Sequence, residues 1–353
     1  MNPIRQNPLL PLTVAVFLTT AAPLASQPAE QRMDSKTLIT FLGFTEDDSI
    51  KTARGELTAK ILKTRDKREV AIVGISLVKV NTECFLARFQ DIEAFKTNPA
   101  VLRIHKLARP AGIEDLERLT LDANDISSLR DCRPGDCTMK LPAGTIEQLR
   151  QEVDWSSPDH AARAQTVFRE WLFDYLERYL SEGNTALIEY QDKGKPVRLA
   201  EEFRSLLQAQ PSLAAVTPAF YEHLAAYPAA PLSGVEQFLY WSTENLGFKP
   251  VTSVTHVMIF RQSGQAIIAS KQIYANHYFD ASLGLTFVLD DPDSPGSMYL
   301  AYLNRSRIDL LGGFFGGLRR LVLRGRLMDG FKKNLQQVAR QLRASCDASL
   351  DRQ

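Results

Sequence analysis

The sequence predicts an α+β protein that combines an antiparallel sheet, a helical middle and one long C-terminal helix. Between residues 252 and 309, β-branched and aromatic runs alternate with turn residues, which is the pattern of an antiparallel meander. Apolar residues recur at helical spacing over residues 157–184 and again over residues 318–342. The chain has 353 residues, 44% of them hydrophobic and 24% charged, which is enough apolar material for a large core.

The chain begins with a segment typical of an export signal. Only Arg5 is charged among the first seven residues, and the apolar run that follows is interrupted by prolines and too short to span a membrane. Small residues between Ala22 and Ser26 suit cleavage, although Pro23 interrupts the usual small-x-small pattern. We predict a signal peptide over residues 1–25 and an exported protein, periplasmic or extracellular. An uncleaved anchor and a cytoplasmic tail are the alternatives.

Residues 26–54 are mostly polar and are interpreted as a loose leader before the main domain, residues 55–344. Alternating or β-branched runs predict three strands in the first part of this domain, at residues 56–64, 70–80 and 101–108. Helical spacing of apolar residues predicts a helix over residues 84–98, which Pro99 ends. A short helix is predicted within residues 112–121, and residues 125–141 are interpreted as a hairpin.

The middle of the domain, residues 145–228, is predicted to be a helical insertion. Helical patterns cover four segments, at residues 145–153, 157–184, 199–210 and 218–228. Gly183 stands where a helix C-cap belongs, and residues 185–194 predict a short strand between the helices.

The last third of the domain is predicted to consist mainly of strands. Residues 235–248 are ambiguous, because Ser233 and Glu236 can form a capping box whereas the aromatic residues suit a strand. Clear strand patterns follow at residues 252–262, 265–279, 281–291 and 298–309. A tail, residues 345–353, follows the final helix.

Four cysteines are present, Cys84, Cys132, Cys137 and Cys346. Cys132 and Cys137 flank the turn sequence RPGD, and in an oxidising compartment this spacing favours a short disulfide loop. Free thiols are the main alternative, because a zinc site would need two further ligands at suitable spacing. Cys84 and Cys346 are interpreted as buried or free thiols, with a disulfide between them as the alternative.

The order of these elements resembles the helix-grip fold of the START and polyketide-cyclase-like (SRPBCC) superfamily. The resemblance is carried by residues 70–80, the helix at 85–95, the meander at 252–309 and the helix at 318–342. It implies a curved antiparallel sheet that grips the C-terminal helix around an apolar cavity for a lipid or another hydrophobic ligand. The helical middle departs from the family pattern, as an insertion or a separate layer.

Such a cavity would be lined by alternate residues of the strands. The candidate ligand-binding residues are apolar Met258, Phe260, Leu285 and Phe287, with His256, Tyr274 or Arg305 for a polar head group. The alternative for His256 is a hydrogen-bonded histidine of the core. The alternative for Arg305 and Arg307 is structural ion pairing, for example with Asp280 or Asp309.

Residues 310–330, LLGGFFGGLRRLVLRGRLMDG, join the meander to the final helix. Four glycines predict a loop, because each glycine costs a helix about 1 kcal/mol. Phe314 and Phe315 in that loop can act as a lid or as a membrane wedge. The helix that follows either packs in the core with a solvated basic face or rests on anionic lipid. A phosphate-binding loop is not indicated, since no Lys-Ser/Thr pair follows the glycines.

Several function classes receive no support from the sequence. The net charge of +1 argues against nucleic-acid binding, the five histidines form no metal motif, and no cofactor is predicted. Catalysis is uncertain, since we find no nucleophile elbow and no carboxylate pair.

Three hypotheses for the function remain. The first hypothesis is an exported protein that binds a hydrophobic ligand. The second is a cell-envelope interaction module with an aromatic surface at Trp171 and Tyr175. The third is a cyclase- or hydrolase-type enzyme with His256 as the base.

Overall fold

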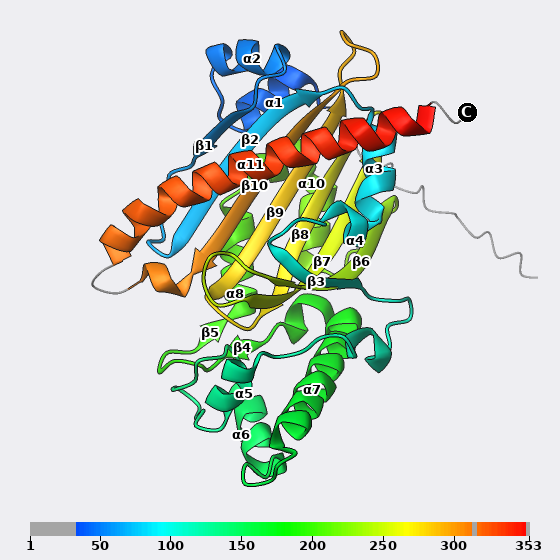
Figure 1. Cartoon of the computed structure of the whole chain (residues 1–353). Coiled ribbons are helices and arrows are strands. Elements are labelled where there is room, and N and C mark those ends of the chain that lie inside the picture. The colour runs from blue at the N-terminus through cyan, green and yellow to red at the C-terminus, as the bar shows by residue number, and fades with distance from the viewer. Residues whose placement is uncertain (1–32, 313–315, 351–353) are drawn as a thin grey trace, which may run out of the picture. The chain divides into compact units, whose positions relative to one another are not determined.

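The computed structural model describes residues 33–312 and 316–350, so the predicted signal peptide, Phe314 and Phe315 lie outside the described residues. An open, eight-stranded antiparallel sheet is its centre (Figure 1), with the strands in the order β1-β2-β10-β9-β8-β7-β6-β3. The strands are β1 (Thr58–Ile61), β2 (Glu69–Val78), β3 (Val101–Lys106), β6 (Val235–Glu244), β7 (Val251–Gln262), β8 (Gln265–Ala275), β9 (Phe279–Asp290) and β10 (Met298–Ile308). The prediction of an α+β protein with a large antiparallel sheet and a C-terminal helix is confirmed.

The strands β7 to β10 form the predicted meander, each pairing with the next along the chain. Gly264 lies in the tight turn between β7 and β8 with φ at 71°, a backbone conformation that residues with a side chain rarely adopt. The ambiguous residues 235–248 resolve as strand β6, which pairs with β7. In this register His256 stands between Leu239 of β6 and Lys271 of β8.

One face of the sheet is covered by α3 (Thr82–Gln90), α4 (Ile92–Phe95) and the C-terminal helix α11 (Gly316–Leu350), which runs across the strands in Figure 1. The apolar stripe of α11 packs on the sheet through Leu335, Ala339 and Leu342. Its basic side chains at Lys332, Lys333, Arg340 and Arg343 are exposed. The described part of α11 is therefore a packed helix with a solvated basic face.

The other face of the sheet is covered by one helix from the N-terminal segment and by helices from the middle of the chain. They are α1 (Ser35–Phe41), α7 (His160–Glu182), α8 (Leu199–Gln208), α9 (Pro211–Val216) and α10 (Pro218–Ala226), and α6 (Ala143–Glu152) packs on α7. Because helices cover both faces, ten successive residues of β7 are buried and the usual polar alternation is absent. Trp171 and Tyr175 of α7 lie in this core, so they provide no aromatic surface for a partner.

Shorter elements complete the described chain. They are α2 (Glu46–Ala53), the 3₁₀ turns η1 (Ile113–Leu116), η2 (Gly183–Ala186) and η3 (Asp309–Leu311), α5 (Ala123–Leu129), and the small strand pair β4 (Glu189–Tyr190) and β5 (Val197–Arg198). Only the turn of the hairpin predicted over residues 125–141 is confirmed, where Arg133 and Asp136 form an antiparallel bridge within the disulfide loop. Asp122 caps α5 by accepting a hydrogen bond from Asp125 N, so the segment starts as a helix and continues as a loop.

Two disulfides cross-link the fold. The predicted Cys132–Cys137 disulfide is confirmed. Cys84 and Cys346 are also joined, which corrects the expectation of free thiols. They belong to α3 and α11, which pack on the same face of the sheet, and this proximity over 262 residues is not visible in a local pattern. Two disulfides fit an oxidising, exported environment. None of the described helices is long and apolar enough to cross a membrane.

Candidate functional site

A pocket of about 470 Å³ lies at the edge of the sheet beside the C-terminal half of α7. It is lined by Leu107, Ala108, Arg109, Pro110, Ala111, Glu177, Leu180, Ser181, Phe238, Leu239 and His256. Strand pairing explains its position. β3 pairs with β6 only from Tyr240 onward, so the first half of β6 has no strand neighbour on that side. The chain after β3 and α7 enclose the space that a further strand would fill.

His256 forms a buried part of this pocket's wall, with 1% of its surface exposed. Its Nδ1 lies 2.8 Å from the hydroxyl oxygen of Tyr179, and its Nε2 lies 3.0 Å from Oε1 of Gln237. The rings of Tyr179 and Tyr227 meet the imidazole edge-on, at centroid distances of 5.5 and 4.8 Å. The imidazole is therefore held by hydrogen bonds at both nitrogens and by aromatic packing.

The hydrogen-bonded chain continues from Tyr179 to Lys271 of β8. Nζ of Lys271 lies 3.2 Å from the Tyr179 hydroxyl and donates to Oδ1 of Asn184. The same ammonium stands 4.1 Å from the centre of the Phe203 ring. Lys271 is fully buried. The groups that contact its Nζ are thus a hydroxyl, an amide and aromatic rings, which carry no formal charge.

Burial shifts the pKa of all three side chains of this hydrogen-bonded chain. It lowers the pKa of Lys271 far below its ordinary value, because the ammonium loses water. It also lowers the pKa of His256 far below 6.5, with a further contribution from the positive charge of Lys271. The pKa of the Tyr179 phenol is raised well above 10 by burial. His256 and Tyr179 are therefore neutral at physiological pH, and strongly perturbed groups beside a pocket are typical of functional sites.

Of the residues predicted to bind ligand, the structure places His256 in the pocket and the others elsewhere. Met258, Phe260, Tyr274, Leu285 and Phe287 share one face of the sheet, as alternation required, and are buried in its core. That face is covered by α7, α8 and α10 rather than by α11. These five side chains therefore pack against the helical middle of the chain.

Arg305 is engaged in an ion pair on the same face of the sheet. Its guanidinium donates to Glu69 of β2 at 2.5 Å, and Arg307 pairs with Glu202 of α8. Structural ion pairing is therefore the role seen for both arginines, with these two glutamates as partners rather than Asp280 or Asp309.

The remaining acids of this region surround a buried lysine that sequence reasoning missed. Nζ of Lys140, 2% exposed, lies 2.8 Å from Asp280, 3.4 Å from Asp309 and 3.5 Å from Asp192. Burial opposes the charge, but the three carboxylates raise the pKa of Lys140 above its ordinary value. This arrangement is a buried ion-pair cluster that joins the loop before α6 to the sheet.

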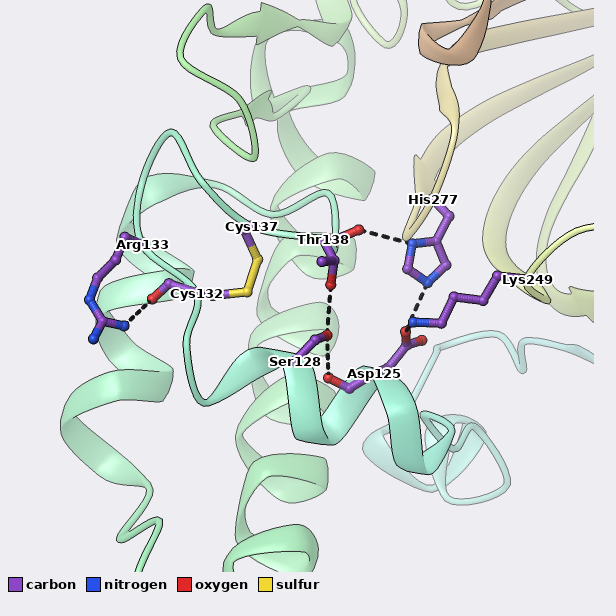
Figure 2. Close-up of a disulfide and its surroundings, with 8 residues drawn as sticks. All are labelled: Asp125, Ser128, Cys132, Arg133, Cys137, Thr138, Lys249 and His277. Atoms are coloured by element: carbon purple, nitrogen blue, oxygen red, sulfur yellow. Dashed lines mark hydrogen bonds and ion pairs between the residues drawn. A yellow bond between two sulfur atoms is a disulfide. The ribbon is translucent and has the colours of Figure 1, made fainter.

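A third buried cluster adjoins the Cys132–Cys137 disulfide (Figure 2). Nε2 of His277 lies 2.9 Å from the Asp125 carboxylate, and Nδ1 lies 3.1 Å from the carbonyl oxygen of Thr138. Both neighbours are oxygen atoms, so the His277 ring is held by hydrogen bonds on either side. Lys249 reaches the same carboxylate. The cluster fastens the disulfide loop to the β8–β9 connection.

Sequence reasoning missed two residues of the hydrogen-bonded chain at His256, Lys271 and Tyr179, although the sequence contained a signal for Lys271. Lys271 shares its strand face with Ile267 and Ala269, and a lysine on an otherwise apolar face needs an internal partner. Tyr179 belonged to the predicted apolar stripe of α7, which concealed its hydroxyl. Among the described residues, no group of three or more His, Cys, Asp or Glu side chains is placed to hold a metal ion.

Comparison with known proteins adds no family to these observations. No family model, no curated protein and no solved structure matches the chain. The sheet and the C-terminal helix are compatible with a helix-grip fold, and the geometry around His256 is what bears on function.

Proposed function

We propose that this protein is exported and binds a small, largely apolar molecule with one polar group in the pocket at the β6 edge. The observation that carries the proposal is the position of His256, a buried polar side chain in the wall of a pocket whose other buried lining residues are Leu107, Phe238 and Leu239. A volume of about 470 Å³ falls within the range of about 300–1,000 Å³ typical of small-molecule sites. An apolar lining with few polar groups is their usual composition.

The geometry supports binding more than catalysis. A general base needs a free lone pair within reach of the substrate proton, and both ring nitrogens of His256 already have partners. Kinship with the START superfamily belongs to this proposal as well. An antiparallel sheet with a long C-terminal helix is compatible with it, although the pocket adjoins α7 rather than α11.

Fluorescence titration with 1-anilinonaphthalene-8-sulfonate, an apolar probe with one anionic group, tests the proposal. We expect saturable binding of one probe per chain, and at least about tenfold weaker binding when Leu180→Trp fills the pocket. Leu246→Trp is the matched control, because Leu246 is 46% exposed and lies outside the pocket lining. Equal probe affinity in Leu180→Trp and wild type, or the absence of saturable binding, would overturn the proposal.

A further inference from the structure

The contacts of Lys271 define which atoms donate in the buried chain. Nδ2 of Asn184 donates to the backbone carbonyls of residues 224–225, at 3.0 and 2.8 Å, so its Oδ1 is the atom that accepts from Lys271. The Tyr179 hydroxyl and the face of the Phe203 ring are the other two neighbours of Nζ. Because Oδ1 of Asn184 can only accept, one N–H of Lys271 is committed to it whether Nζ is an ammonium or, as its burial favours, a neutral amine.

The amide oxygen of Gln237 sets the direction of the whole chain, because Oε1 can only accept and Nε2 of His256 must therefore carry the hydrogen. In the neutral imidazole Nδ1 is then the acceptor, so the Tyr179 hydroxyl donates to Nδ1, 2.8 Å away, and its oxygen accepts from Nζ of Lys271. A neutral imidazole with an accepting Nδ1 carries its hydrogen on Nε2. Nε2 then donates to Oε1 of Gln237 at 3.0 Å, and every atom of the chain is satisfied.

We propose that Lys271 and Tyr179 are positioning residues that hold His256 as an Nε2–H donor in the pocket wall, and that the pocket therefore selects ligands whose polar group is a hydrogen-bond acceptor, such as a carboxylate or a carbonyl. This inference rests on the proposed function of the pocket. The bound acceptor replaces Oε1 of Gln237, a side chain that is only partly buried. An alkylammonium offers no acceptor, so it cannot take the place of Gln237 on Nε2 and gains no hydrogen bond from His256.

The charged residues at the rim of the pocket do not distinguish an acceptor ligand from an alkylammonium in the way that His256 does. Arg109 and Glu177 line the rim with opposite charges, and both are exposed, so water and salt weaken their effect. The titratable groups around His256 are Tyr179, Tyr227, Lys271, His223, Arg109 and Glu177. The fixed donor on His256 therefore remains as the main discriminating group.

The first measurement reads the tautomer directly and needs no ligand. Long-range ¹H–¹⁵N NMR of the histidine-labelled protein, with the His256 signals assigned by their loss in His256→Gln, should show a protonated Nε2 and an unprotonated Nδ1. We expect this pattern to persist unchanged between about pH 6 and pH 8. In Tyr179→Phe and in Lys271→Met, His256 should become a mixture of tautomers. A protonated Nδ1 or an imidazolium in the wild type, or one unchanged tautomer in both variants, would overturn the positioning role.

The second measurement compares two ligands that differ in the head group alone. Decanoate should bind the wild-type protein at least about tenfold more tightly than decylamine, and the ratio should approach one in Tyr179→Phe. Equal or tighter binding of decylamine to the wild type would overturn the acceptor selection while leaving the pocket a ligand site. Binding of neither compound would refute both the ligand class and the proposed function, whereas the tautomer result stands independently.

Discussion

Removal of the Cys84–Cys346 disulfide tests how strongly a covalent cross-link stabilises the packing of α11 on the sheet. The disulfide closes a loop of 262 residues, whereas Cys132–Cys137 closes a loop of 5. A cross-link stabilises the folded state mainly by restricting the unfolded chain, and the effect grows with the logarithm of loop length. It amounts to about 5 to 6 kcal/mol for the long loop and about 2 kcal/mol for the short one.

The double replacements C84A/C346A and C132A/C137A form a matched pair. Each removes one disulfide and leaves two small apolar side chains, so the difference between them isolates loop length. We expect C84A/C346A to lose about 3 to 4 kcal/mol more of its free energy of unfolding than C132A/C137A.

Urea titration of the oxidised proteins, followed by circular dichroism, supplies the two free energies of unfolding. Equal losses, or a larger loss in C132A/C137A, would refute the reasoning from loop entropy. Noncovalent packing would then account for the attachment of α11 to the sheet without a contribution from the disulfide.

Two further predictions concern the other buried charges. Lys140→Met should lower the free energy of unfolding by about 3 to 5 kcal/mol, because it leaves buried carboxylates without their cation. Lys193→Met, at an exposed lysine, is the control and should lower it by less than about 1 kcal/mol. Similar losses in the two variants, measured by urea unfolding, would contradict the burial argument. Burial raises the pKa of Asp125, but His277 and Lys249 lower it below 3.8 overall. Its contribution is therefore complete above pH 3.8 and is lost as pH falls below that value, so Asp125→Asn should be less stable than wild type at neutral pH, with a gap that narrows in acid. Urea midpoints of both proteins, measured across that pH range, test this prediction. A stability difference between Asp125→Asn and wild type that does not change with pH would contradict the role given to the Asp125 carboxylate.

The main elements were predictable because their signals are local. The meander follows from β-branched runs and turn residues, and α7 and α11 follow from apolar spacing within each segment. The first strand of the hairpin predicted at residues 125–141 failed for a local reason as well, because the N-cap at Asp122 favours a helix. His256 was identified as a polar group on an apolar strand face, and the structure places it in a pocket wall.

By itself the sequence determined the antiparallel meander, the two long helices and the short Cys132–Cys137 loop, since each depends on residues close together in the chain. Only the tertiary structure decided the partners of His256, Lys271 and Cys84, which lie 77, 92 and 262 residues away from the groups they meet. Such contacts depend on strand order and on which helix covers which face. No periodicity encodes those choices, because they arise from the packing of whole elements.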